Sequence, residues 1–480
     1  MEFSFFKNPK GRLIAPDGTV IPGEELLARA NAVTHALRAR GLQPGDAVGM
    51  CLTNSPEVFA LYLGICQAGM YLIPINWHSA KPEVDYIVKD SGAAVLICNE
   101  QTAAICEGGI RLVELIAGAS TAAPQDRLAG GIMNYTSGTT GNPKGVRRPL
   151  PPCAPEPVVS NYAAFLLMYG LTPNAGVHLV CSPLYHTAVL YFGSSALHLG
   201  HDLVLMDGFS PEGFLQRCSD WKVDSSHMVP THFVRLLTVE NKSDYDLSSL
   251  KAMVHSAAPC PIPVKQEMLD WWGDCIYEYY AATEGGGTMV GPQDWREKPG
   301  TVGKPWHGAD IAVHGDDGAK LGPDVPGTVY IKMAQGFEYH RDPEKTKKAW
   351  DVPGYFTVGD VGYLDSDGFL FLCDRKADLI ISGGANIYPA EVESALITHP
   401  AVMDVAVFGI PNAEFGEEVK AVVEASGVTA EALLDWAHER LAKYKCPRSV
   451  DFVDALPRDP NGKLKKRLLR DPYWEGRTQI

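Results

Sequence analysis

The chain has 480 residues, of which 46% are hydrophobic and 21% charged, an ordinary composition for a globular protein. This length exceeds what one hydrophobic core supports, so we expect two or more domains. The formal net charge of -15 argues against a broad nucleic-acid-binding surface. The eleven cysteines are scattered without a C-x-x-C pair, which indicates neither a zinc site nor a disulfide framework and favours a reducing compartment.

The sequence predicts a cytoplasmic protein. No apolar run approaches the ~18 residues that a membrane span needs. Residues 1–12 are polar and aromatic and lack the apolar region of a secretory signal.

The first hundred residues alternate between helical and strand patterns. Leu26, Ala30, Val33 and Leu37 recur at helical spacing, and Pro56 marks the first turn of a second helix. Strands alternating with helices predict a parallel α/β sheet. The expected strands are 46–52, 70–75 and 93–98, and a third helix is expected from residue 82.

The middle of the chain predicts a second α/β portion that continues the first to about residue 290. Residues 99–131 have little periodicity, and a run of prolines over 149–157 predicts an irregular connector. The expected strands are 177–181, 203–206, 227–230 and 252–255.

The sequence pattern changes after residue 291, where short strands separated by Gly/Asp/Pro turns predict a β-rich subdomain over about 291–375. A hairpin is expected around Asp365-Ser366-Asp367-Gly368. The charged segment that follows predicts a hinge at 376–378, and the remaining pattern predicts a small α/β domain over 379–480. The fold class is therefore α/β, with a large N-terminal domain over 1–375.

A loop rich in glycine and threonine has the sequence Tyr135-Thr136-Ser137-Gly138-Thr139-Thr140-Gly141-Asn142-Pro143-Lys144-Gly145. Its glycines bring backbone N–H groups close to an anion, its hydroxyls add donors, and Lys144 adds one compact positive charge. These groups suit a polyphosphate. The loop is not a Walker loop, because Lys144 is followed by Gly145 rather than by Ser or Thr. Taken alone, the composition also fits a flexible polar linker.

Five separated segments together resemble the adenylate-forming superfamily, which includes acyl-CoA synthetases, aryl-CoA ligases, nonribosomal adenylation domains and firefly luciferases. The segments occur in the family's order and cover nearly the whole chain, and their number makes the resemblance specific. They are 136–145, 280–284, 355–360, 374–375 together with 382–391, and 457–463.

The resemblance implies that the N-terminal domain binds ATP and a carboxylic acid, whose carboxylate attacks the α-phosphorus and expels pyrophosphate. Such a reaction needs positioning and charge neutralisation. Tyr280 would face adenine, and Asp360 would accept both ribose hydroxyls. Taken alone, Tyr280 also fits a core aromatic and Asp360 a turn residue. The expected ATP-binding residues are Thr136, Ser137, Gly138, Thr140, Gly141, Lys144, Ala257, Ala258, Tyr280, Thr283, Asp360 and Arg375.

The resemblance also implies three catalytic residues: Thr139, Glu284 and Lys463. Thr139 belongs to the phosphate loop, and Glu284 would hold Mg²⁺, which takes one or two carboxylates together with phosphate oxygens. Lys463 would stabilise the pentacoordinate transition state. Taken alone, Glu284 also fits a solvated loop acid and Lys463 a basic tail.

In the second half-reaction that the resemblance implies, the thiol of CoA attacks the acyl-adenylate and AMP leaves. The small domain rotates between the two steps. Gly383 and Gly384 would then let the backbone pass close to the pantetheine arm.

The resemblance also implies a pocket for the acid, in which His186 matches a position that closes the acyl pocket in relatives. His186 also fits a satisfied core histidine. The three consecutive glycines Gly285-Gly286-Gly287 are expected to leave room for a bulky acyl group. The expected lining is Tyr185, His186, Val229, Ser256, Gly285 and Gly286, with Pro230, His255 and Gly287 beside them.

Ala377 departs from the family, which usually places Asp or Lys at this hinge position. One hypothesis is that the domain swing is biased toward one half-reaction, and the favoured alternative is that Asp378 serves instead.

The leading prediction is an ATP-dependent carboxylic acid–CoA ligase that acts on small molecules. One alternative keeps a single half-reaction, either adenylation for a carrier protein or thioester formation from a supplied acyl-adenylate. Another class is a catalytically idle acyl or nucleotide binder. A luciferase has no positive sign, and the failed Walker pattern disfavours a kinase or GTPase. The sequence does not name the acid or settle whether the chain forms a homodimer.

Overall fold

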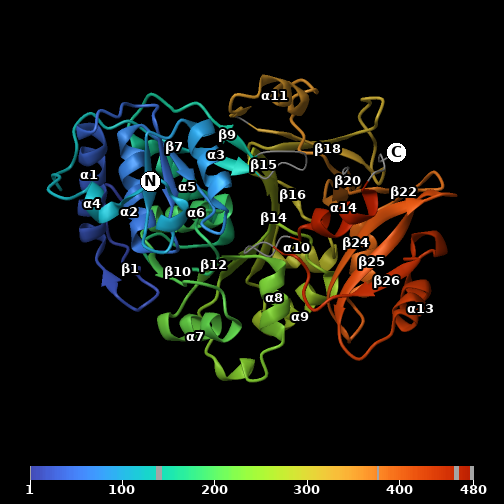
Figure 1. The fold of residues 1–480 in the computed structure, drawn as a ribbon. Coiled ribbons are helices and arrows are strands. Elements are labelled where there is room, and N and C mark those ends of the chain that lie inside the picture. The colour runs from blue at the N-terminus through green and yellow to red at the C-terminus, as the bar shows by residue number, and fades with distance from the viewer. Residues whose placement is uncertain (1, 137–142, 334, 376–377, 459–463, 476–480) are drawn as a thin grey trace.

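The computed structural model describes residues 2–136, 143–333, 335–375, 378–458 and 464–475 (Figure 1). Helices alternate with strands as far as residue 282, and mostly short strands follow up to residue 375. The orange and red elements of the C-terminal part lie to one side of the blue and green N-terminal elements (Figure 1). The predicted α/β class is confirmed.

A five-stranded sheet near the N-terminus has the order β6-β5-β3-β4-β7, and all its neighbouring strands are parallel. The three strands expected here from the sequence are confirmed as β3, β4 and β5. Between β5 and β7 lie a 3₁₀ turn, η1 (Ala103–Ile105), and a short helix, α4 (Leu112–Leu115), where no pattern was recognised. The strands are β3 Ala47–Cys51, β4 Tyr71–Pro74, β5 Val95–Cys98, β6 Ile110–Arg111 and β7 Gly131–Ile132.

The helices of this part follow the predicted apolar periodicity. In α1 (Gly23–Ala39) the residues at helical spacing are buried, and α2 (Pro56–Ala68) is buried from Val58 to its end. The two helices pack tightly at Gly64, where a Cβ atom would lie 2.6 Å from the Cβ of Val33. Glycine therefore allows this close approach. The third helix, α3, covers Lys81–Ser91.

A nine-stranded sheet forms the centre of the molecule, in the order β16-β15-β14-β13-β12-β10-β11-β1-β2. The expected strands are found as β10, β11, β12 and β13, which are parallel to one another. The bounds expected for the third were wrong, because β12 ends at Met228 and helix α8 begins at Pro230, where proline suits a first turn. The N-terminal β1 joins this sheet by pairing with β11, so the chain begins here and only then builds the smaller sheet. The strands are β1 Leu13–Ile14, β2 Val20–Ile21, β10 Val177–Val180, β11 Asp202–Leu205, β12 Ser225–Met228, β13 Ala252–His255, β14 Ile276–Ala282, β15 Gly285–Val290 and β16 Lys304–Pro305.

The expected irregular connector is correct only as far as residue 154. Helix α5 (Pro155–Phe165) begins at Pro155, and the 3₁₀ turn η2 (Leu166–Tyr169) follows it. The prediction was wrong for Pro155 and Pro157, because proline is favoured in the first turn of a helix, where its missing N–H has no intrahelical partner. Helix α6 (Thr187–Leu199) packs against α5.

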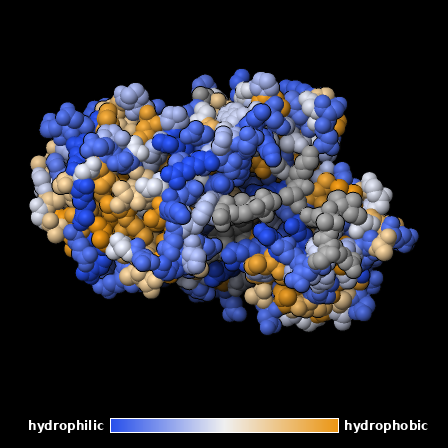
Figure 2. All heavy atoms as spheres, turned by 45° about the horizontal axis from the view of Figure 1, so that its top comes forward, coloured by the Kyte–Doolittle hydropathy of each residue, from blue (hydrophilic) through white to orange (hydrophobic). Residues whose placement is uncertain are grey.

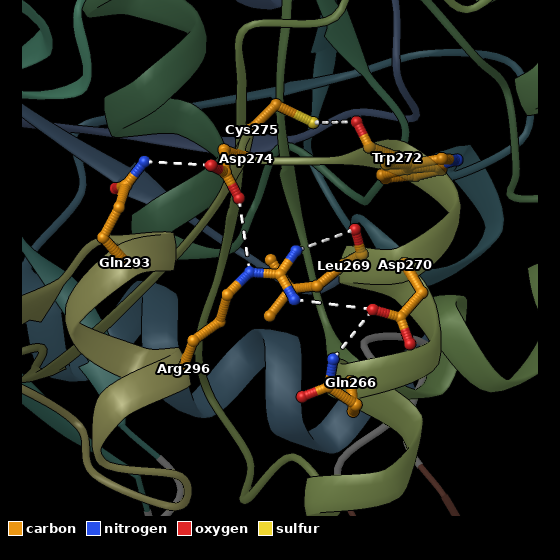
Figure 3. Close-up of polar contacts among 8 residues, drawn as sticks. All are labelled: Gln266, Leu269, Asp270, Trp272, Asp274, Cys275, Gln293 and Arg296. Carbon is orange, nitrogen blue, oxygen red and sulfur yellow. Dashed lines mark hydrogen bonds and ion pairs between the residues drawn. The ribbon is translucent and has the colours of Figure 1, made fainter.

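Helices α7 (Pro211–Trp221), α8 (Pro230–Leu237), α9 (Ile262–Trp272) and α10 (Pro292–Glu297) belong to the central part. Figure 3 shows Arg296 of α10 reaching the end of α9. Its Nη2 donates to the Leu269 carbonyl at 3.2 Å, and Nη1 and Nε lie 3.4 Å from Asp270 and Asp274. A cation at a helix C-terminus satisfies unpaired carbonyls and favours the helix dipole.

Two small antiparallel sheets follow. One has the order β17-β18-β20-β21 and contains the predicted hairpin, and the other has the order β19-β9-β8. The second sheet joins residues near 140 to residues near 339, beside helix α11 (Pro343–Ala349). The strands are β8 Asn134–Thr136, β9 Lys144–Arg147, β17 Asp310–His314, β18 Gly327–Lys332, β19 Glu338–Tyr339, β20 Asp360–Leu364 and β21 Leu370–Arg375.

The C-terminal residues build their own sheet, β23-β22-β25-β24 with β26 beside β25, and their own apolar core. Helices and strands both occur in this part, so the α/β pattern predicted for it is confirmed. The 3₁₀ turn η4 (Lys443–Lys445) precedes β26. The elements are β22 Ile380–Ser382, β23 Ala385–Ile387, α12 Pro389–Leu396, β24 Val402–Asn412, β25 Gly416–Ala425, α13 Ala430–Arg440, β26 Ser449–Phe452 and α14 Lys466–Trp474.

The surface is mixed. In Figure 2 hydrophilic residues occupy most of the middle of the visible face, and hydrophobic residues gather at its left end, on the side of the N-terminal elements. Among the described residues, no helix has the length and apolar character needed to cross a membrane. The domain boundaries at 375 and 379 stay predictions, and Ala377, on which the hinge hypothesis rests, lies outside the described residues.

Candidate active site

The phosphate loop is held by a hairpin of β8 and β9. Thr136 and Lys144 are register partners at its base, and the Thr136 hydroxyl donates to the Lys144 carbonyl at 3.4 Å. The Lys144 ammonium lies 3.3 Å from the Asp342 carboxylate, which was not expected from the sequence. The predicted residues Ser137, Gly138, Thr139, Thr140 and Gly141 lie outside the described residues.

Glu284 lies in the turn between β14 and β15 and is buried, so it is not a solvated loop acid. The hydroxyl of Tyr339 donates to its Oε1 at 2.7 Å. Burial, together with the charge of Glu284, raises the pKa of Tyr339, which keeps that hydroxyl protonated and donating. One oxygen of a carboxylate fixed in this way remains for a hard cation such as Mg²⁺, which takes few protein carboxylates.

A second cation lies beside this carboxylate. Lys345, near the start of α11, places its ammonium 4.1 Å from the centre of the Tyr339 ring. Burial lowers the pKa of Lys345, while Glu284 and Asp342 act against that shift. Lys144 and Lys345 therefore face an acidic pair, Glu284 and Asp342, which gives this end of the site both signs of charge.

Tyr280, Asp360 and Arg375 meet although 80 residues separate the first two. The Tyr280 hydroxyl donates to Asp360 Oδ2 at 2.6 Å, and Arg375 Nε lies 3.4 Å from Oδ1. Asp360 and Arg375 are register partners on β20 and β21. The structure thus brings together the residues expected around adenine and ribose, with both carboxylate oxygens of Asp360 engaged by protein groups.

The predicted wall opposite Tyr280 follows β13. Ala257 has φ +74°, in the left-handed region that a residue with a Cβ rarely adopts. Ala258 is half-buried beside it. Local strain of this kind is frequent at ligand-binding positions, which agrees with the predicted role.

The expected acid-pocket residues come from several elements. Tyr185 is buried, His186 is the N-cap of α6, and Val229 is the buried N-cap of α8. Ser256 follows β13 and contacts Nε2 of His227 at 3.0 Å. His227 was not recognised in the sequence because its strand gave no signal beyond apolar burial.

His255 was expected at the acid pocket, but it faces the other side of the central sheet. Its Nε2 lies 3.6 Å from Glu278 Oε2, and its ring packs on Phe233 of α8. Successive residues of a strand point to opposite faces, so Ser256 and His255 cannot both face the same space. His227 contacts Ser256 at 3.0 Å and lies 3.1 Å from the Tyr279 hydroxyl, so it is the histidine on the Ser256 side of the sheet.

Gly285, Gly286 and Gly287 all have positive φ. A Cβ on Gly286 would lie 2.1 Å from Ile331, and one on Gly287 would lie 1.8 Å from the Tyr280 carbonyl. The tight backbone at this turn therefore requires glycine at these positions. This requirement explains the three glycines better than the room for an acyl group that was expected from the sequence.

The C-terminal loop expected beside pantetheine is the hairpin of β22 and β23, where Gly383 and Gly384 have φ of +57° and +80°. Next to Gly383 lies a cavity of about 240 Å³, also lined by Phe415, Lys443, Tyr444 and Arg448. The Arg448 guanidinium lies 4.3 Å from the centre of the Phe415 ring. Lys463 lies outside the described residues.

The sequence matches two family models: AMP-binding enzyme over residues 12–338, and AMP-binding enzyme C-terminal domain over residues 391–463. It is 33% identical to a feruloyl-CoA synthase from Amycolatopsis, with 96% of each chain covered. It is 32% identical to the long-chain-fatty-acid–CoA ligase FadD13 from Mycobacterium tuberculosis, with 94% of this chain and 92% of the relative covered.

Among solved structures, the ATP-bound MatB from Rhodopseudomonas palustris superposes with a TM-score of 0.85 at 31% identity. The superposition covers 98% of this chain and 99% of that one. The chain belongs to the AMP-binding enzyme family, within the adenylate-forming superfamily that its motifs resemble. It is an enzyme of the AMP-forming acid–thiol ligase type.

Proposed function

We propose that this enzyme is an ATP-dependent carboxylic acid–CoA ligase with both half-reactions intact. The observation that carries the proposal is the convergence of distant residues on one turn. Thr283 and Glu284 form that turn, and Tyr280 lies in β14 just before it. Tyr339 donates to Glu284 at 2.7 Å, and Tyr280 donates to Asp360 at 2.6 Å. A nucleotide site needs these groups close together, whereas a structural role gives no reason to gather them.

In the first half-reaction an oxygen of the substrate carboxylate forms a bond to the α-phosphorus of ATP, and the bond to pyrophosphate breaks. Thr136, Lys144 and the loop between them hold the phosphates, and Asp360 holds the ribose. Lys463 balances the charge of the transition state. Lysine near the reacting phosphorus stabilises by position and charge, without taking or giving a proton.

Mg²⁺ is part of the proposal, and Glu284 is the residue that would hold it. The buried carboxylate fixed by Tyr339 suits a cation that prefers one or two protein carboxylates with phosphate oxygens. When bound, the ion neutralises charge on the phosphate oxygens. Among the described residues, no group of three or more His, Cys, Asp or Glu side chains forms a metal site.

In the second half-reaction the sulfur of CoA forms a bond to the acyl carbon, the bond to AMP breaks, and the thiol proton is released. The cavity beside Gly383 supports CoA as the acceptor rather than a carrier protein. Its two cations, Lys443 and Arg448, suit phosphate groups, and Tyr444, 56% exposed, offers a ring to a base. A carrier protein would present only its pantetheine arm to this cavity.

The proposal is tested with a panel of carboxylic acids in two assays. Pyrophosphate release is followed with ATP and Mg²⁺, and acyl-CoA is followed by mass spectrometry after CoA is added. Both signals with one acid establish the complete ligase. Pyrophosphate alone points to a carrier-protein loader, and acyl-CoA formed only from a synthetic acyl-adenylate means that the thioester step alone survives. A chain silent in every assay that still binds ATP is an idle binder.

Dimerisation and a cytoplasmic location, both raised by the sequence, stay proposals. Light scattering of the purified protein tests the first, and cell fractionation tests the second.

A further inference from the structure

Arg148 lies immediately after β9 and has no role in the proposed chemistry so far. Its carbonyl accepts a hydrogen bond from the Tyr71 hydroxyl at 2.7 Å, which fixes the backbone at the end of the strand. Its side chain crosses to the catalytic turn, where Nη2 donates to the Thr283 carbonyl at 2.7 Å. The same nitrogen lies 3.3 Å from where a Cβ of Gly285 would stand.

The nearest rings to this guanidinium are aromatic, and one carboxylate acts on it from further away. Burial lowers the pKa of Arg148, while Tyr162 of α5, Glu284 of the catalytic turn and Tyr191 of α6 act against that shift. These two rings pack against each other with centroids 5.5 Å apart. Among the described residues, no carboxylate lies within ion-pair distance of Arg148, and Thr283 accepts its one hydrogen bond.

Arg148 is half-buried, and a cation that loses part of its hydration without gaining an ion pair is left at a cost. One of its five N–H donors is used by Thr283. The remaining donors form a planar fork that matches a carboxylate. This arrangement points to an anionic ligand that completes the pair when it binds.

That anion is not well matched to a phosphate of ATP. Lys144, at the phosphate loop, starts the four-residue strand β9, and Arg148 follows the end of that strand. Four residues of extended chain place their backbones about 13 Å apart. The Arg148 side chain is turned toward α5 and α6, and α6 begins directly after His186, at the acid pocket.

We propose that Arg148 determines the acid specificity of this enzyme, and that its substrate carries a second carboxylate that pairs with the Arg148 guanidinium. This inference rests on the proposed ligase function. Because Arg148 is bonded to Thr283, next to Glu284, the second carboxylate is separated from the reacting one by a short spacer. Tyr162 and Tyr191 contact the apolar part of that spacer.

The test compares matched acids that differ only in the second carboxylate: succinic with butyric, glutaric with pentanoic, and benzene-1,2-dicarboxylic with benzoic acid. The wild-type chain is expected to prefer the diacid of at least one pair. Arg148→Met is expected to lower kcat/KM for that diacid at least about 30-fold, since truncating one partner of a buried charge pair loses that much or more. The monoacid should change less than threefold, so the preference is lost.

Arg147→Met is the matched control. Arg147 is the neighbouring arginine, and its guanidinium lies 5.1 Å over the Tyr71 ring, on the other face of β9. Arg147→Met removes the same charge from the adjacent residue, the last of β9, and should leave the diacid preference unchanged. Arg148→Lys, which keeps the charge but loses the planar fork, should fall between wild type and Arg148→Met.

Three results would overturn the inference. A preference of the wild-type chain for the monoacids would show that Arg148 does not pair with a second carboxylate of the substrate. An equal loss for both acids of a pair, with a raised KM for ATP, would assign Arg148 to the nucleotide. A lowered thermal midpoint of Arg148→Met without ligand, together with an equal loss of kcat/KM for both acids of a pair, would assign it a structural role through the Thr283 hydrogen bond.

Ligand-induced thermal shifts separate this inference from the proposed function. Stabilisation of the wild type by diacids, absent in Arg148→Met and unaccompanied by pyrophosphate release, would support the specificity and refute the ligase. Pyrophosphate release restricted to monoacids would support the ligase and refute the specificity. No stabilisation by any diacid, with no pyrophosphate release from any diacid or monoacid, would overturn both.

Discussion

The buried ion pair between Lys265 and Glu278 supports the strand that leads into the catalytic turn. Lys265 of α9 lies 2.6 Å from Glu278 of β14, and their side chains are 0% and 8% exposed. Glu278 precedes Tyr280 by two residues. We expect Lys265→Met to lower the free energy of unfolding by about 3–5 kcal/mol, because it leaves a buried carboxylate without its cation. Typical domain stabilities are about 5–15 kcal/mol, so the loss is large.

The loss should depend on pH in a definite direction. Burial already raises the pKa of Glu278 in the folded protein, and removal of Lys265 raises it further. A carboxylate with a raised folded pKa destabilises the fold when it is ionised. The deficit of Lys265→Met should therefore be greatest near neutral pH, shrink as pH falls through the raised pKa, and approach zero below the unfolded value of about 4.3.

Urea unfolding followed by tryptophan fluorescence measures this loss, because the Lys265 ammonium lies 4.8 Å over the Trp295 ring. Lys222→Met is the matched control. Lys222 pairs with Asp246 at the same 2.6 Å, but their side chains are 58% and 51% exposed, so little or no change is expected. The double variant Lys265→Met/Glu278→Gln should recover most of the loss. Equal effects of Lys265→Met and Lys222→Met, or a loss independent of pH, would refute the reasoning.

Three further predictions concern the site. Tyr339→Phe removes the 2.7 Å hydrogen bond to Glu284, and a charge-assisted bond of this kind contributes about 1.5–3 kcal/mol. The Mg²⁺ concentration for half-maximal pyrophosphate release should therefore rise at least tenfold. An unchanged Mg²⁺ titration would contradict the role of Glu284. Asp360→Ala should weaken ATP binding in titration calorimetry, and unchanged affinity would remove Asp360 from the ribose site. Lys463→Ala should slow adenylation by orders of magnitude yet spare thioester formation from a supplied acyl-adenylate, and equal losses in both steps would count against the assignment.

Local pattern was sufficient for the elements of the N-terminal part. The spacing of Leu26, Ala30, Val33 and Leu37 gave α1, and buried runs gave β3, β4 and β5. These signals lie within a few residues of one another, so a sequence displays them directly. Pairing of β1 with β11 joins residues about 190 apart, and no local pattern specifies such a contact.

The candidate site divides in the same way. Glu284, Asp360 and Lys144 were found because they belong to motifs, and the structure adds the partners Tyr339 and Asp342 that fix two of them. Tyr339 is the last residue of β19 and Asp342 is the N-cap of α11, and neither position has a functional signature in the sequence. The choice between His227 and His255 depends on which face of a strand turns toward α6, and a register error of one residue inverts it.

Contacts from three separate parts of the chain meet at the turn between β14 and β15. Asp360 reaches it through Tyr280, Arg148 through the Thr283 carbonyl, and Tyr339 through Glu284. In the proposed function these are the groups that meet ribose, the acid and the metal, so each ligand shares or displaces a contact that now holds the turn. The glycines after Glu284 have positive φ throughout, and a Cβ at Gly286 or Gly287 would clash with Ile331 or the Tyr280 carbonyl, so no larger residue fits there. Under the proposed function, binding of one ligand would change the support of the turn that receives the others.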